Sequence, residues 1–321
     1  MTEKGVRAVR RDLFRRGLIL AAVGLLIAGL TVYSFGWFVN SVRVTGEGLS
    51  VKVATDDYNL AVSGDQELRF PDNHPIVNYL KQSAVGGYQK LASTNAANPA
   101  LLCRMANERP HVVGSEEIAP GAFGTVSFDI VVPENSQYTA FTINLSYLPV
   151  ASTSAGLASV NAADENELRA LLSGHILLFK TRSDLQGGGR YYSDPIDGSI
   201  TFTLAEHTPT QEEDGLHYTV TFYWIWPSTF GQMVFADGDE RVHSHAVFSS
   251  SAERAAMISR MVSEPNDFFH NLDSNTVDLT ADGFEDYYYV ELSEAYNAAD
   301  QFLGDRIRYL AVIATVVDAE E

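Results

Sequence analysis

A stretch of 21 residues without a charged side chain, Leu18 to Phe38, constrains this chain most strongly. As a helix it would be about 31 Å long, which matches the hydrocarbon core of a bilayer. The 17 residues before it hold six basic and two acidic side chains, whereas the rest of the chain holds 16 basic and 39 acidic ones. Because a short basic flank stays in the cytoplasm, the sequence predicts a single-pass protein with its N-terminus cytoplasmic and its C-terminus extracytoplasmic.

The predicted chain has three parts: a cytoplasmic basic segment at 1–17, a transmembrane helix at 18–38 acting as a signal anchor, and an extracytoplasmic domain at 39–321. A cleaved signal peptide has the same charge pattern, but its apolar core usually covers only about 7–15 residues. Val32-Tyr33-Ser34 offers a poor small-residue cleavage site. We therefore expect the anchor to stay in the cell membrane, while cleavage would release a secreted protein.

The exported part carries a net charge of −23, which repels nucleic acid and anionic lipid. Nucleic acid is therefore excluded as a partner, and the contact expected with the membrane is through Leu18 to Phe38. The single cysteine, Cys103, allows no intramolecular disulfide, so the exported domain must be held together by its hydrophobic core. Its apolar neighbours Leu101 and Leu102 predict that Cys103 is buried.

Alternating apolar and polar residues predict strands through most of the exported part. A short strand is expected at 49–53, and clearer ones at 125–132, 141–147, 200–204 and 218–226. We expect the second and third of these to form one hairpin and the last two another, each with one apolar face. Tyr309 to Val317 is nearly continuously apolar, as in a strand covered on both faces.

Helices are predicted between these strands. Short helical pieces are expected around Ile76–Lys81 and over Asp164–Leu172, the latter ending at Gly174. Ser250 to Glu253 fits a capping box that opens a helix ending before Pro265. A further helix is expected over about Ser293–Leu303, capped by Gly304. The predicted fold is all-β with inserted helices, a jelly-roll-like or β-sandwich ectodomain in one domain.

The segment from Asp237 to His245 gathers ionisable side chains and is the candidate metal site of this sequence. Asp237, Asp239, His243 and His245 are residue types that could hold Zn²⁺. Their spacing matches no established metal motif, including the His-Glu-x-x-His helix of zinc proteases. We therefore expect a solvent-facing surface loop with no metal and no other cofactor.

Trp224 and Trp226 lie two residues apart on a predicted strand and share a face with Phe222. An exposed row of this kind would be a platform for stacking on sugars. Because the same face continues into Val220, the sequence favours a place in the core. Gly187 to Gly189 precedes no helix that could seat a phosphate and is expected to be a hairpin tip. No nucleophile elbow occurs, so we expect no enzyme.

Three features resemble secreted matrix proteins of the TasA/camelysin group. They are the apolar segment ending in Gly36-Trp37-Phe38, the Gly-spaced run from Val44 to Val51, and the Pro120-Gly121 turn leading to Phe128-Asp129-Ile130. The resemblance covers mainly the first 150 residues. It implies a jelly-roll subunit of a surface or biofilm-matrix fibre, in which an N-terminal strand can complete the sheet of the next subunit. The basic residues before the apolar run and the poor cleavage site depart from that pattern.

The sequence therefore leads to three functional hypotheses. The first is a membrane-anchored or secreted, non-catalytic cell-surface or matrix protein that acts through its β-sandwich and associates with itself or other surface proteins by β-strand addition. The second is a surface-displayed carbohydrate- or peptide-binding module. A metal-dependent hydrolase is the third.

Overall fold

The computed structural model describes residues 58–61, 75–76, 100–105, 107–108 and 118–319, which all belong to one unit that begins at Asp57. The predicted anchor at Leu18–Phe38 and the predicted strand at 49–53 lie outside the described residues, as does most of the predicted helix around Ile76–Lys81. Among the described helices, none combines the length and the apolar character needed to cross a bilayer.

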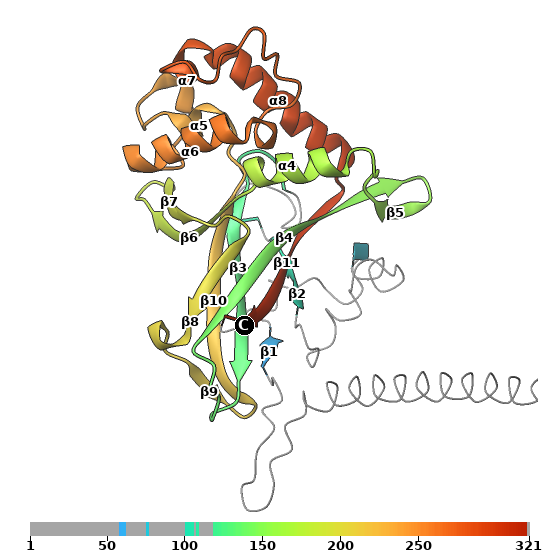
Figure 1. The fold of residues 1–321 in the computed structure, drawn as a ribbon, viewed down its shortest axis with the longest axis vertical. Coiled ribbons are helices and arrows are strands. Elements are labelled where there is room, and N and C mark those ends of the chain that lie inside the picture. Colours follow the sequence, from blue (N-terminus) through green and yellow to red (C-terminus); the bar gives the residue numbers. More distant parts are fainter. Residues whose placement is uncertain (1–57, 62–74, 77–99, 106, 109–117, 320–321) are drawn as a thin grey trace, which may run out of the picture. The chain divides into compact units, whose positions relative to one another are not determined.

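Two antiparallel sheets form the body of the described part, as expected for a β-sandwich (Figure 1). Sheet A has the strand order β1 (Asn59–Ala61), β3 (Phe123–Val132), β10 (Gly215–Ile225), β6 (Leu177–Asp184), β7 (Arg190–Pro195), with β9 (Thr210–Glu212) paired to the start of β10. Sheet B has the order β2 (Ala100–Arg104), β11 (Tyr309–Asp318), β4 (Ala140–Thr153), β5 (Gly156–Ser159), with β8 (Ser199–Thr203) paired to the first part of β4.

Helices gather at one end of the sheets, and β9 lies at the opposite end (Figure 1). They are α4 (Glu165–His175), α5 (Gly231–Val234), α6 (Ser251–Ser263), α7 (Phe284–Tyr287) and α8 (Tyr289–Arg306). Short 3₁₀ turns are η2 (Leu204–Glu206), η3 (Glu240–Val242) and η4 (Pro265–Asp267).

The strands predicted from alternation are present, but the two predicted hairpins are wrong. β3 lies in sheet A and β4 in sheet B, and β8 and β10 are likewise divided between the sheets. β3 instead pairs with β10, which places Phe128 opposite Val220, and β4 pairs with β8, which places Ile143 opposite Ile200. Alternation fixes which face of a strand is buried, but it carries no information about the neighbouring strand.

The predicted faces are confirmed, because the apolar residues of all four strands meet in one core between the sheets. This core contains Val126, Phe128, Ile130, Val132, Phe141, Ile143, Leu145, Ile200, Phe202, Leu204, Val220, Phe222 and Trp224, and Tyr147 packs against it. The strand predicted at the C-terminus is also confirmed. β11 lies between β2 and β4, with Val312 in the main core and Ala311 in a small cluster with Ile76 and Val150.

A second apolar cluster joins the helices to the strands of sheet A. It includes Phe179, Tyr192, Phe230, Met257 and Tyr296. The predicted capping box of α6 is confirmed, since Ser250 Oγ accepts a hydrogen bond from the Glu253 N–H at 3.2 Å.

Both glycines expected to end helices lie inside them. α4 continues through Gly174 to His175, and α8 continues through Gly304 to Arg306. A Cβ on Gly174 would lie 2.1 Å from the carbonyl oxygen of Asp267. Glycine is therefore needed there because the η4 turn packs directly against the helix backbone.

Candidate functional site

Trp224 and Trp226 are both buried, with 0% and 5% of their surface exposed. Neither ring is available for stacking on a sugar, so the core position favoured by the sequence is the one observed. Trp226 has a further contact that the sequence did not reveal. Its Nε1–H donates a hydrogen bond of 2.7 Å to Asp300 Oδ1 on α8.

Asp300 belongs to a buried polar network that joins the sandwich to the helices. His175, with no exposed surface, places Nδ1 2.6 Å from Asp300 Oδ1 and Nε2 3.0 Å from the carbonyl oxygen of Phe268. Its ring also stacks on Tyr296, with 4.1 Å between centroids. The two ring nitrogens therefore connect a carboxylate on α8 with the backbone that follows η4. The network is a tertiary connection between α4, α8 and the end of β10.

The acidic loop at 237–245 makes its own internal contacts. Asp239 accepts hydrogen bonds from the backbone and the guanidinium of Arg241, and these bonds lower the pKa of Asp239 to about 2. Asp237 lies 3.3 Å from His245 Nδ1 and accepts a hydrogen bond from the Tyr191 hydroxyl at 2.5 Å. His243 is exposed and adopts a positive φ of 60°. Among the described residues, the four predicted candidates do not converge as a set of metal ligands.

The loop also holds the tip of the β6–β7 hairpin. The Leu185 N–H donates to the Gly189 carbonyl at the predicted hairpin tip. A Cβ on Gly189 would lie 2.5 Å from the imidazole of His245, so the bare glycine allows that ring to pack closely. His245 therefore contacts both the acidic loop and the hairpin.

A different group of ionisable side chains converges at the opposite end of the sandwich. One ligand atom each from Glu212, Asp214 and His217 lie within 4.8 Å of one another. His217 Nε2 is 2.7 Å from Asp214 Oδ1, and its Nδ1 is 3.5 Å from Asp129 Oδ2. These are ligand types that Zn²⁺ accepts, but the mutual ion pairs explain the arrangement without a cation. The pairing of β9 with β10 brings the group together, which the acidic composition of this turn alone did not reveal.

This cluster should make stability depend on pH. Burial of the His217 ring opposes protonation, but the nearby carboxylates outweigh it and raise the pKa of His217 above its usual value. The hydrogen bond from His217 lowers the pKa of Asp214. A raised histidine pKa adds stability below the unfolded pKa of about 6.5, and this gain is lost as pH rises through the folded pKa. A lowered aspartate pKa adds stability that is lost as pH falls through the folded value.

His217→Gln should therefore lower the melting temperature more at pH 5.5 than at pH 9. Thermal unfolding of the wild type and the variant at both values measures this difference. His207→Gln is the matched control, because this substitution removes a ring of the same size. The His207 ring stacks on Phe202, with 4.0 Å between ring centroids. A penalty that is larger at pH 9 would contradict the assignment of these ion pairs.

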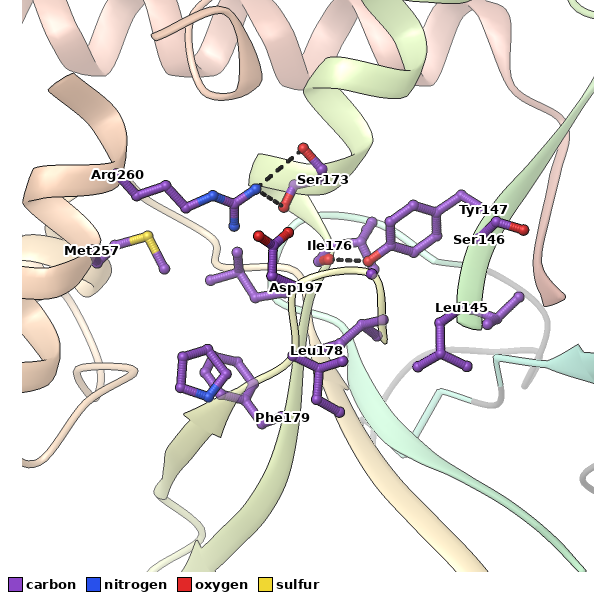
Figure 2. Close-up of a pocket in the computed structure, with 15 residues that line it drawn as sticks. Leu145, Ser146, Tyr147, Ser173, Ile176, Leu178, Phe179, Asp197, Met257 and Arg260 are labelled. Atoms are coloured by element: carbon purple, nitrogen blue, oxygen red, sulfur yellow. Dashed lines mark hydrogen bonds between the residues drawn. The ribbon is translucent and has the colours of Figure 1, made fainter. Parts of the chain in front are cut away.

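A cavity of about 160 Å³ lies where the sandwich meets the helices (Figure 2). It opens beside the stretch of β4 between the part paired with β8, at 140–144, and the part paired with β5, at 150–153. Its walls are mostly apolar and come from both hydrophobic clusters. The apolar lining consists of Leu145, Ile176, Leu177, Leu178, Phe179, Ile196, Met257 and Val312.

Polar groups surround the mouth of this cavity. Arg260 on α6 is the cation, with 25% of its side chain exposed, and Asp197 in the β7–β8 connection is the anion (Figure 2). Tyr147 closes another side, and its hydroxyl donates to the carbonyl oxygen of Ile176. The lining residues are spread from Leu145 to Val312 and share no motif, so the cavity could not be predicted from any local segment of the sequence.

Cys103 is buried, as its apolar neighbours predict, with 3% of its surface exposed. Burial raises the pKa of its thiol to about 12. Because the thiolate is the nucleophilic form, this environment makes Cys103 a packing residue rather than a reactive one.

The short strand β1 is seated in the sandwich by its side chains. Tyr58, just before it, is 5% exposed, and Leu60 within it is 6% exposed. The Tyr58 ring packs against Tyr138 and Phe141 at centroid distances of 5.3 and 4.7 Å, and its hydroxyl donates to the Val316 carbonyl. β1 pairs with only three residues of the ten-residue β3, Asp129–Val131.

Comparison of the chain with protein-family models, with curated proteins and with solved structures gives no match.

Proposed function

We propose that this chain is a non-catalytic cell-surface or matrix protein whose sandwich associates with copies of itself, or with other β-proteins, by strand addition. Leu18 to Phe38 anchors it in the cell membrane as a single-pass protein, and cleavage of that segment would release it. The exported domain faces the extracytoplasmic side because the basic residues flank the N-terminal end of the apolar segment.

The seat of β1 carries this proposal. The strand is three residues long, yet Tyr58 and Leu60 are almost fully buried beside it. If β1 of one copy paired with β3 of a second copy, it would make the same contacts that it makes within its own chain. Main-chain pairing with β3 would supply affinity, and the packing of the Tyr58 ring against Tyr138 and Phe141 would supply specificity.

We further propose that the sandwich is of the jelly-roll type. The pairings are nested, since β3 pairs with β10 while β4 and β8, which lie between them in sequence, pair with each other in the opposite sheet. Such nesting arises when a long two-stranded ribbon folds over itself, as in a jelly roll.

The assembly can be tested with the double variant Asn59→Cys/Val131→Cys, because these two residues are opposite partners in β1 and β3. The full chain is expressed in membranes, oxidised and run on a denaturing gel without reductant. Exchange of β1 should give covalent dimers and larger species, and each single variant is the control. If the new thiols are consumed by oxidation and the double variant still runs only as a monomer, β1 pairs within its own chain and the proposal fails.

A surface-displayed binding module is the second candidate, and the cavity between sandwich and helices favours it. Ligand sites are usually concave and apolar, with a few polar groups that fix orientation. The cavity beside β4 has this composition, with Arg260 and Asp197 at its mouth. If the gel experiment gave no covalent dimers, strand exchange would be contradicted, but this second candidate would not be.

A further inference from the structure

We propose that the cavity beside β4 binds a free α-amino acid with an apolar side chain. The side chain would enter the cavity, while the carboxylate meets Arg260 and the ammonium meets Asp197. This inference goes beyond the proposed strand exchange and does not rest on it, since the cavity and the seat of β1 share no residue.

The apolar part of the cavity sets the size of the ligand. Ile176, Phe179 and Val312, which have no exposed surface, form its deep walls. An apolar cavity of roughly 150 Å³ can hold a benzene-sized group. The observed 160 Å³ therefore suits a side chain of the size of leucine or phenylalanine.

Arg260 is held in place but keeps donors to spare. Its Nε donates to Glu264 at 3.0 Å, and its Nη2 donates to Asp267 at 3.0 Å and to the Ser173 carbonyl at 3.3 Å. Within the described part of the chain, Nη1 makes no hydrogen bond. A fixed guanidinium with a remaining N–H pair is suited to a carboxylate.

Asp197 supplies the opposite charge. Figure 2 shows its carboxylate directed toward Arg260, and the two groups form no ion pair with each other. The carboxylate of Asp197 has no hydrogen-bonding or ion-pair partner among the described residues. Because the two charged groups lie beyond ion-pair distance of one another, each remains available to a ligand group of opposite charge.

The charge balance selects a zwitterion over a simple acid. Glu264 and Asp267 already contact Arg260, so together with Asp197 the surroundings hold three carboxylates against one guanidinium. An isolated anion would be repelled by this excess. A free α-amino acid carries both charges on groups bonded to the same carbon, and it has no net charge. The terminus of a peptide carries only one of them at that position.

Equilibrium dialysis of the purified full chain with radiolabelled L-leucine tests the site. Two analogues dissect the headgroup: 4-methylpentanoate keeps the carboxylate without the ammonium, and 3-methylbutylamine keeps the ammonium without the carboxylate. We expect saturable binding of leucine and competition by each analogue that is weaker by about tenfold or more, since each loses a charge-assisted hydrogen bond. Glycine, which has no side chain to fill the cavity, should compete poorly.

Asp197→Asn should weaken leucine binding by about tenfold without disturbing the fold, because this exposed carboxylate makes no hydrogen bond or ion pair with the described residues. Asp305→Asn, at an exposed site on α8, is the matched control and should bind as the wild type does. Arg260→Lys should also weaken binding, since an ammonium does not reproduce the guanidinium fork.

Three results would overturn the assignment. They are no saturable leucine binding, equal binding of leucine and both analogues, and an Asp197→Asn variant with unchanged affinity in the same buffer as the control. None of them depends on whether β1 exchanges between copies.

Discussion

Phe128→Ala should lower the free energy of unfolding by about 3–5 kcal/mol, and Phe222→Ala by a similar amount. Both rings have no exposed surface and lie in the core between the sheets. They stand on adjacent strands, where Phe128 faces Val220 and Phe222 faces Val126 across the β3–β10 ladder. Truncation would leave a cavity that the two rigid sheets cannot close.

Urea unfolding of these variants should be compared with that of their sequence neighbours. Ser127 and Thr221 lie on the outer face of the same two strands, where their hydroxyls are 3.1 Å apart in an exposed hydrogen bond. Ser127→Ala and Thr221→Ala should each change stability by only about 0.5 kcal/mol. Equal damage from Ser127→Ala and Phe128→Ala would contradict the assignment of inner and outer faces.

Asp300→Ala should destabilise the protein by about 3–5 kcal/mol, as expected when one partner of a buried charged network is removed. The carboxylate, whose side chain is 11% exposed, is the acceptor for Trp226 Nε1 and the partner of His175 Nδ1. Without it, two buried polar groups would lose their contacts where water cannot replace them easily.

Asp305→Ala provides the control for this variant on the same helix. Its side chain is exposed, so the change should cost no more than about 0.5 kcal/mol. Chemical unfolding measures both variants, and the tryptophan fluorescence of the folded chain should change in Asp300→Ala because the surroundings of Trp226 are altered. If both aspartate variants unfolded at the same denaturant concentration, the network would contribute nothing to the joint between sandwich and helices.

The alternation of apolar residues was sufficient to predict the strands and their buried faces. Each face is a local property, because successive side chains of a strand point to opposite sides. The partner strand is not local. The predicted hairpin needs the segment between the two strands, 133–139, to reverse the chain within one sheet, but this segment carries the chain from β3 in one sheet to β4 in the other.

Glycine shows the same division between local and tertiary causes. Gly174 and Gly304 have the residue type typical of a helix end, but both helices continue past them. At Gly174 the reason is a contact 93 residues away in sequence, where Asp267 packs against the helix backbone. In contrast, the Ser250–Glu253 cap was predictable because all of its hydrogen bonds are made within one turn.

Three features can be predicted from the sequence alone: the charge asymmetry around Leu18 to Phe38, the strands with their inner faces, and the burial of Cys103 and Trp224. These follow from composition and from periods of two or 3.6 residues, which any short window of the chain displays. Other features are visible only in the folded chain: which strands pair, the hydrogen bond from Trp226 to Asp300, and the position of Arg260 and Asp197 at one cavity. Such contacts join residues tens of positions apart, and they form only because the core brings two sheets and the helices together.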